Sequence, residues 1–186
     1  MPRVKAIFVG LVTCALAAAV CGQTTAPVTA PNPLYDAWQG QEKKTVTFDR
    51  QETISGGAPV GGQRPARHST VSETCTQLTD AEAVIQIAQD NQPAQTLTIP
   101  AKVSPDDPAF PKAAGTEDIK IGDKTYTCKK YTYYTRSKAE MGRDGQGLAG
   151  TVTVWIADGV PGGIVQRNIS LTIRASYDIT EKMVAR

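Results

Sequence analysis

The chain has 186 residues, enough for one domain, and its 16 Gly and 12 Pro favour short strands and loops over long helices. Its charge is nearly balanced, with 20 Lys and Arg against 18 Asp and Glu, and Arg3 and Lys5 supply the excess. A balanced chain lacks the clustered positive charge that nucleic-acid binding requires, so we expect no nucleic-acid partner.

The N-terminus has the pattern of a secretory signal. Arg3 and Lys5 precede an apolar run from Ala6 to Val20, and small residues follow it. This run of about fifteen residues is shorter than the roughly twenty that a membrane span needs, which leaves an uncleaved anchor as the alternative. We therefore predict a signal peptide over residues 1–22 and an exported mature protein, which would be periplasmic, at the cell surface or extracellular.

Cys21 offers a third interpretation, in which the mature protein is a bacterial lipoprotein that begins at a lipidated cysteine. The residues before it, Ala18, Ala19 and Val20, match a lipobox in part, since Val20 stands where Gly, Ala or Ser is usual. Residues 23–33, QTTAPVTAPNP, are uncharged and rich in Thr, Ala and Pro, so we expect an extended tether there. Such a tether suits a protein that is held at a membrane surface.

Residues 34–186 are predicted to form one β domain. The apolar cluster LYDAW comes first, and we interpret it as a helical turn or a cap on the core in which Trp38 packs against the sheet. The alternative is an exposed aromatic contact for a partner. Residues 83–89 fit a strand better than a helix, although Asp80 could cap a helix there. Pro100 is expected at an edge, at a bulge or at the end of its strand. Other strands are expected over 44–55, 68–78 and 95–103.

A hairpin is predicted over the turn Gly122-Asp123, a pairing that tight hairpins favour. Its second strand, TYTCKKYTYYTR, places Tyr126 and Tyr134 on one face and Tyr131 and Tyr133 on the other, because side chains alternate along a strand.

Two more strands are predicted to end the chain, beginning at Gly150. They are joined by a turn in which Pro161 fixes one backbone angle and Gly162 and Gly163 permit positive ones. Apolar and polar residues alternate over the eleven residues 169–179, which predicts an unbroken half-buried strand. The sum is about eight strands, so the predicted fold class is all-β, with a single antiparallel sheet.

The order of a Trp near the start, the hairpin IGDKTYTCKKYTYYT and the late segment TVTVWIADGVPGGIVQ resembles uncharacterised exported bacterial proteins. More distantly, the layout is similar to curved antiparallel half-barrels such as the periplasmic lipoprotein-carrier and LppX type. The resemblance covers roughly residues 34–184. It implies a curved sheet whose apolar face would hold a lipid or a lipidated protein.

Cys75 and Cys128 are the cysteines that follow the signal, and exported proteins meet an oxidising environment, so a disulfide between them is predicted. Closing a loop of this size would stabilise the fold by roughly 4 kcal/mol in the chain-entropy model. The alternative is two separate buried thiols. Two distant cysteines and a single His, His68, lack the ligand clusters of a zinc site, so no metal is expected.

We predict no catalytic residue and no cofactor. His68 is the only histidine of the chain, and no sequence motif places an acid or a nucleophile beside it. A hydrolase that uses His68 is therefore a hypothesis kept only for testing. Tyr is common in strands for reasons of propensity, but an aromatic face could also bind a ligand. The candidate binding surface consists of Trp155, Tyr126, Tyr131, Tyr133 and Tyr134.

Two functions of different classes follow from these features. The first is a non-catalytic binding or carrier module of the cell envelope, whose partner would be a lipid or an envelope protein. The second is a structural or interaction protein with a filled core and no small-molecule ligand. The chain has few large apolar residues with which to line a lipid cavity, with Phe 3 and Trp 2. Contact with the membrane is expected only through the N-terminal anchor.

Overall fold

The computed structural model describes residues 28–55, 65–90, 92–137, 148–172 and 176–184. The predicted signal peptide, Cys21 and most of the predicted tether lie outside them. In chain order the elements are β1 (Ala30–Pro31), α1 (Pro33–Asp36), β2 (Thr45–Ser55), β3 (Arg67–Leu78), β4 (Glu82–Gln89), β5 (Gln95–Pro100), β6 (Lys102–Val103), β7 (Lys112–Ile121), β8 (Lys124–Ser137), β9 (Leu148–Ile156), β10 (Ile164–Thr172) and β11 (Ser176–Met183).

Nine strands form one antiparallel sheet in the order β5-β4-β3-β2-β11-β10-β9-β8-β7. The first and last strands of this sheet in the chain, β2 and β11, pair with each other and so join two meanders. The sheet is not closed, because β5 and β7 are its two edges. Strands β1 and β6 form a separate pair of two residues each. The prediction of an all-β fold with an antiparallel sheet is confirmed.

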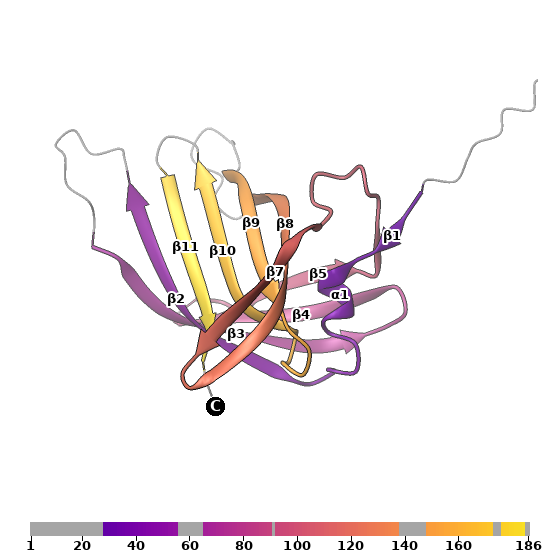
Figure 1. The fold of residues 1–186 in the computed structure, drawn as a ribbon, viewed down its shortest axis with the longest axis horizontal. Coiled ribbons are helices and arrows are strands. Elements are labelled where there is room, and N and C mark those ends of the chain that lie inside the picture. Colours follow the sequence, from indigo (N-terminus) through magenta and orange to yellow (C-terminus); the bar gives the residue numbers. More distant parts are fainter. Residues whose placement is uncertain (1–27, 56–64, 91, 138–147, 173–175, 185–186) are drawn as a thin grey trace, which may run out of the picture.

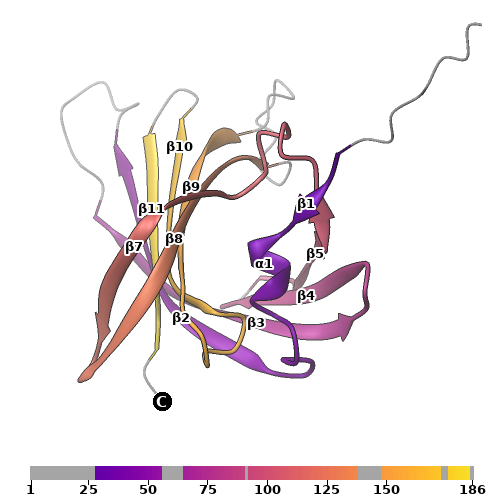
Figure 2. The same cartoon turned by 45° about the vertical axis from the view of Figure 1, so that its right-hand side comes forward.

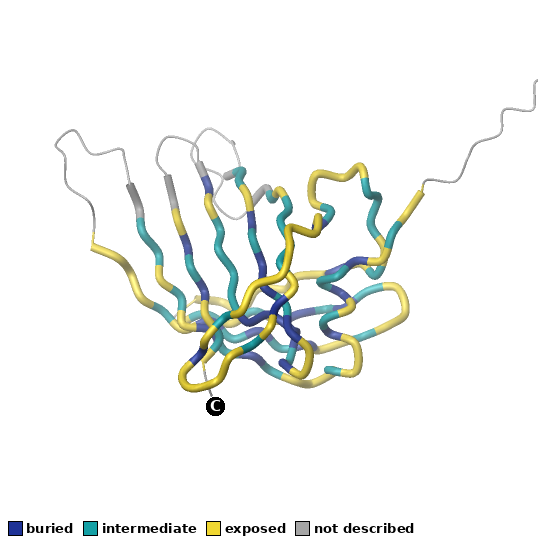
Figure 3. The backbone as a smooth tube through the Cα atoms, in the orientation of Figure 1, coloured by how far each residue is buried: buried dark blue, intermediate teal, exposed yellow. Residues whose placement is uncertain are grey.

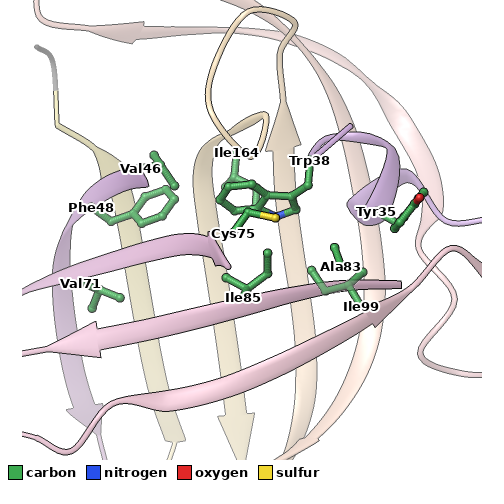
Figure 4. Close-up of a cluster of buried hydrophobic side chains, with 10 residues drawn as sticks. All are labelled: Tyr35, Trp38, Val46, Phe48, Val71, Cys75, Ala83, Ile85, Ile99 and Ile164. Atoms are coloured by element: carbon green, nitrogen blue, oxygen red, sulfur yellow. The ribbon is translucent and has the colours of Figure 1, made fainter. Parts of the chain in front are cut away.

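The strands of the sheet do not all run in the same direction. Figures 1 and 2 show β3, β4 and β5 running steeply across the direction of β9, β10 and β11, with α1 lying over the open side. Side chains from the two parts meet between them in an inner cluster, where Ile164 of β10 packs with residues of β3, β4 and β5 (Figure 4). The inner cluster consists of Tyr35, Trp38, Val46, Phe48, Val71, Cys75, Ala83, Ile85, Ile99 and Ile164.

A second, outer cluster lies on the opposite face of the sheet. Trp155 is buried in this cluster, and its neighbour Val154, which points to the inner face, is buried as well. The connection between β9 and β10 contributes Val160 to this cluster. Figure 3 shows that burial is concentrated in these two regions. The outer cluster consists of Ile121, Cys128, Trp155, Ala157, Val160 and Val165.

Several predicted elements are confirmed. Residues 83–89 belong to the strand β4, and Pro100 is the last residue of β5, an edge strand, where a missing N–H does no harm. The hairpin of β7 and β8 turns at Gly122, whose φ is 58°. Trp38 is 1% exposed within the inner cluster, so it packs against the sheet as expected.

The unbroken strand predicted over 169–179 is wrong, because β10 ends at Thr172 and β11 begins at Ser176, and the two strands pair. Ile169 lies opposite Ile179 in that pair. Opposed residues of an antiparallel pair share a face, and in this register odd-numbered residues oppose odd-numbered ones. The alternation is therefore in the same phase in β10 and in β11, so it could not mark the break.

The predicted disulfide is also wrong. Cys75 belongs to the inner cluster and Cys128 to the outer cluster, and both are free and buried. Each thiol lies near a backbone carbonyl of its own strand, at 3.5 Å from Gln77 O and 3.3 Å from Tyr126 O. Burial raises the pKa of both thiols. The two cysteines are on opposite faces of the sheet, so the alternative of two separate buried thiols holds.

Candidate functional site

The five aromatic residues of the predicted binding surface lie on two faces of the sheet. Trp155, Tyr126 and Tyr134 are on the outer face, since Trp155 and Tyr126 pack in the outer cluster and Tyr134 shares the face of Tyr126. Tyr131 and Tyr133 alternate with them on β8 and so point to the inner face. The surface therefore divides into an outer group and an inner tyrosine pair.

Trp155 is held in place by polar partners on the outer face. Its Nε1 donates to Glu117 Oε2 at 2.9 Å, and Lys130 Nζ lies 3.2 Å from the same oxygen and 5.0 Å from the indole centroid. The hydrogen bond from Trp155, followed by that from Lys130, lowers the pKa of Glu117. With its N–H bonded and 5% of its surface exposed, Trp155 stabilises the fold and offers little contact area to a ligand.

The segment that carries α1 is fixed firmly to the sheet. Asn32 caps the helix by accepting from Leu34 N at 3.1 Å, and its Nδ2 donates to Pro100 O at 2.9 Å. Tyr35 Oη donates to Thr79 O at 2.6 Å. Together with the buried Trp38, these contacts hold α1 over the open side of the sheet (Figure 2).

The segment that carries α1 packs against the predicted turn with Pro161, Gly162 and Gly163. Both glycines have φ of +66°, and a Cβ at Gly162 would lie 2.7 Å from Trp38 Cε2. A Cβ at Gly163 would lie 2.8 Å from Ala37 Cβ. The glycines are therefore required for backbone conformation and for close approach to α1. The positive φ at these glycines was predictable from the sequence, but their close approach to α1 was not.

A pocket of about 290 Å³ lies between this segment and strands β8 and β9, and we call it the α1–β8 pocket. Its charged groups are Asp36 from the end of α1, Asp158 from the β9–β10 connection and Lys129 from β8. Tyr131 brings an aromatic ring to the same pocket, so the pocket includes one member of the inner tyrosine pair. The lining consists of Pro31, Pro33, Asp36, Ala37, Thr127, Lys129, Tyr131, Ile156, Ala157 and Asp158.

A smaller pocket of about 230 Å³ lies where the two clusters approach each other. Its lining is drawn from the start of β2, Tyr126, the residues Gly159 to Pro161 and the end of β11. Its lining contains no charged residue, whereas the α1–β8 pocket offers charged groups that could bind a polar ligand.

Four charged residues form an ionic cluster on the inner face: Arg50, Glu73, Arg167 and Glu181. Arg167 Nη2 donates to Glu73 Oε1 at 2.6 Å, and its Nε lies 3.3 Å from Glu181 Oε2. Arg50 Nη1 lies 3.8 Å from Glu181 Oε1. Two strands, β2 and β11, separate β3 from β10 in the sheet, so the bond from Arg167 to Glu73 spans the inside of the fold.

The two carboxylates of the ionic cluster are buried, and its two arginines are partly exposed. Burial acts to lower the pKa of Arg167, but the carboxylates of Glu73 and Glu181 outweigh it and raise that pKa above its usual range. Burial raises the pKa of the nearby Tyr133. Nε of Arg50, Nε of Arg167 and Oε2 of Glu181 have no hydrogen-bond partner among the described residues. No pattern in the sequence indicates this cluster, because its members come from four strands and no two are neighbours in the chain.

His68 lies exposed on β3, opposite Gln51 of β2. In the described parts of the chain, no three His, Cys, Asp or Glu residues are grouped so that they could hold a metal ion. The helices in those same parts are all too short or too polar to cross a membrane.

Comparison with known proteins gives no assignment, since no protein-family model matches the chain and no curated protein matches it significantly.

Proposed function

We propose that the protein is an exported, non-catalytic binding module of the cell envelope that takes a small polar ligand in the α1–β8 pocket. The observation that carries this proposal is the convergence of Asp36, Asp158, Lys129 and Tyr131 on one pocket from three separate parts of the chain. Ligand sites typically combine an apolar lining with a few placed polar groups, and the prolines, alanines and Ile156 supply that lining here.

The site is held ready for a ligand. Asn32, Tyr35 and Trp38 fix one wall, and the glycine turn fixes that wall against β9 and β10. A wall that is already ordered loses little conformational entropy on binding, which favours affinity. The predicted tether joins the domain at β1, whose Pro31 lines the pocket. In an anchored protein, the α1–β8 pocket would therefore lie close to the anchor.

Size and charge favour a small polar ligand over an acyl chain. The pocket volume of about 290 Å³ lies at the lower limit of small-molecule sites, which are roughly 300–1,000 Å³. The inner face, where a half-barrel carrier would hold a lipid, bears the ionic cluster, and burying charge beside an acyl chain is costly. A lipid carrier is therefore the weaker form of the binding hypothesis.

A panel of small polar compounds, including monosaccharides, amino acids and polyamines, tests the proposal through thermal shift followed by calorimetric titration. We expect at least one class to bind and its affinity to fall about tenfold or more in Tyr131→Ala and in Asp158→Asn. Tyr134→Ala is the matched control, because Tyr134 is 39% exposed and on the outer face. Binding that Tyr131→Ala leaves unchanged would place the ligand elsewhere and refute the proposal.

The second candidate is a structural or interaction protein with a filled core. It is favoured by the inner cluster, in which Phe48, Cys75 and Ile85 are fully buried. If the whole compound panel fails to bind, while the protein is recovered with another envelope protein, this candidate replaces the binding module.

A further inference from the structure

Strand β7 presents a long open edge. It has ten residues, it pairs with β8 alone among the strands that the structure describes, and residues 112–118 are exposed (Figure 3). The other edge, β5, has six residues and ends at Pro100, whose carbonyl is bonded by Asn32. An uncovered edge with free N–H and C=O groups is a template for strand addition, so β7 is the edge to consider.

The sequence of β7 restricts which strand could be added by a second copy of the chain. In a two-fold symmetric antiparallel pair, one residue must face itself, and its neighbours at equal distances on either side face each other. Each possible dimer is therefore specified by the residue at its centre. The charges of Lys112, Glu117, Asp118 and Lys120 then discriminate between these centres.

Five of the ten centres oppose like charges. A centre at Thr116 sets Lys112 against Lys120 of the second copy, and centres at Lys112, Glu117, Asp118 or Lys120 set each of these residues against itself. A centre at Gly115 falls on the bulge between Ala113 and Gly115, where φ of Gly115 is +119° and the ladder is interrupted.

Past the bulge, over residues 116–121, Ile119 is the one centre that pairs opposite charges within β7. It sets Asp118 against Lys120 of the second copy and Lys120 against Asp118, so that two such pairs form about the axis. Ile119 then faces its own copy, and it already packs against the outer cluster. The apolar contact at the axis would continue that cluster from one copy into the other.

We propose that β7 is a homodimerisation edge, at which two copies join their sheets antiparallel in the register centred on Ile119. Asp118 and Lys120 select this register, and the same charges discourage pairing with unrelated strands.

Sedimentation velocity on the mature full-length chain tests the proposal. We expect a monomer–dimer equilibrium in the wild type, weakened about tenfold or more in Lys120→Glu and in Asp118→Lys, because each variant opposes like charges twice. Mixing the two variants should restore the dimer, since one chain then carries two lysines at these positions and the other carries two carboxylates. Neither residue belongs to a described cluster, so both variants should fold.

Lys112→Glu is the matched control, because Lys112 lies beyond the bulge and outside the proposed register. It should leave the dimer unchanged. A wild type that stays monomeric at every concentration overturns the proposal. So does a dimer that survives both variants, or one that Lys112→Glu disrupts more than Lys120→Glu does.

Discussion

Replacing Arg167 by Met tests whether the ionic cluster stabilises the fold across the inside of the sheet. The side chain of Arg167 is 13% exposed, and those of its partners Glu73 and Glu181 are each 4% exposed. Met keeps much of the length of the Arg side chain and removes its charge. Among the residues that the structure describes, Glu73 then has no cation in contact, while Glu181 keeps only the longer contact of 3.8 Å to Arg50.

The expected loss in free energy of unfolding is about 3–5 kcal/mol, the range for leaving a buried charge without its partner. That is a large part of the roughly 5–15 kcal/mol that a typical domain has. The double variant Glu73→Leu/Arg167→Met should recover much of the loss, because it removes both charges of the 2.6 Å pair and leaves the Arg50–Glu181 pair.

Urea denaturation of the wild type, the single variants and the double variant measures these terms. Lys130→Met is the control, because the pair that it breaks with Glu117 has side-chain exposures of 33% and 48%. Its cost should be about 1 kcal/mol or less. If Arg167→Met costs no more than this control, or if the double variant is as unstable as the sum of its single variants, the cluster does not hold the fold as we describe.

Three further predictions concern the glycine turn, the thiols and a buried tyrosine. Gly162→Ala should cost more stability than Gly159→Ala. An alanine is strained by the positive φ at either position, at about 1–2 kcal/mol, but only at Gly162 would its Cβ also meet a side chain, that of Trp38. Equal losses would contradict this packing. Alkylation in denaturant without reductant, followed by peptide mass spectrometry, should find Cys75 and Cys128 both modified, and a peptide linked through them would contradict the structure. Folding raises the pKa of Tyr133, so above about pH 10 the unfolded chain loses this proton first and stability falls as pH rises; Tyr133→Phe should reduce that fall, and an unchanged pH profile would contradict it.

Local patterns predicted the strands well where they were set by alternation and by turn residues. The strand β4, the hairpin at Gly122 and the position of Pro100 all follow from one-dimensional signals. The break between β10 and β11 escaped them, because the register keeps the odd-numbered residues of both strands on one face.

Contacts between distant strands escaped prediction for a different reason. Arg167 meets Glu73 across 94 positions, and the strands between them determine which residues can meet. The pairing of Cys75 with Cys128 was inferred from their number and compartment, but a disulfide needs both residues on one side of the sheet. The α1–β8 pocket combines three segments in the same way, and only Tyr131 among its polar residues was a candidate from the sequence.

Native mass spectrometry of the mature protein after mild extraction tests whether the α1–β8 pocket holds a small polar ligand. We expect a bound compound, much lighter than a phospholipid, that is retained in Tyr134→Ala and lost in Tyr131→Ala. A co-purifying lipid or acyl chain, retained equally by the wild type and by Tyr131→Ala, would contradict it.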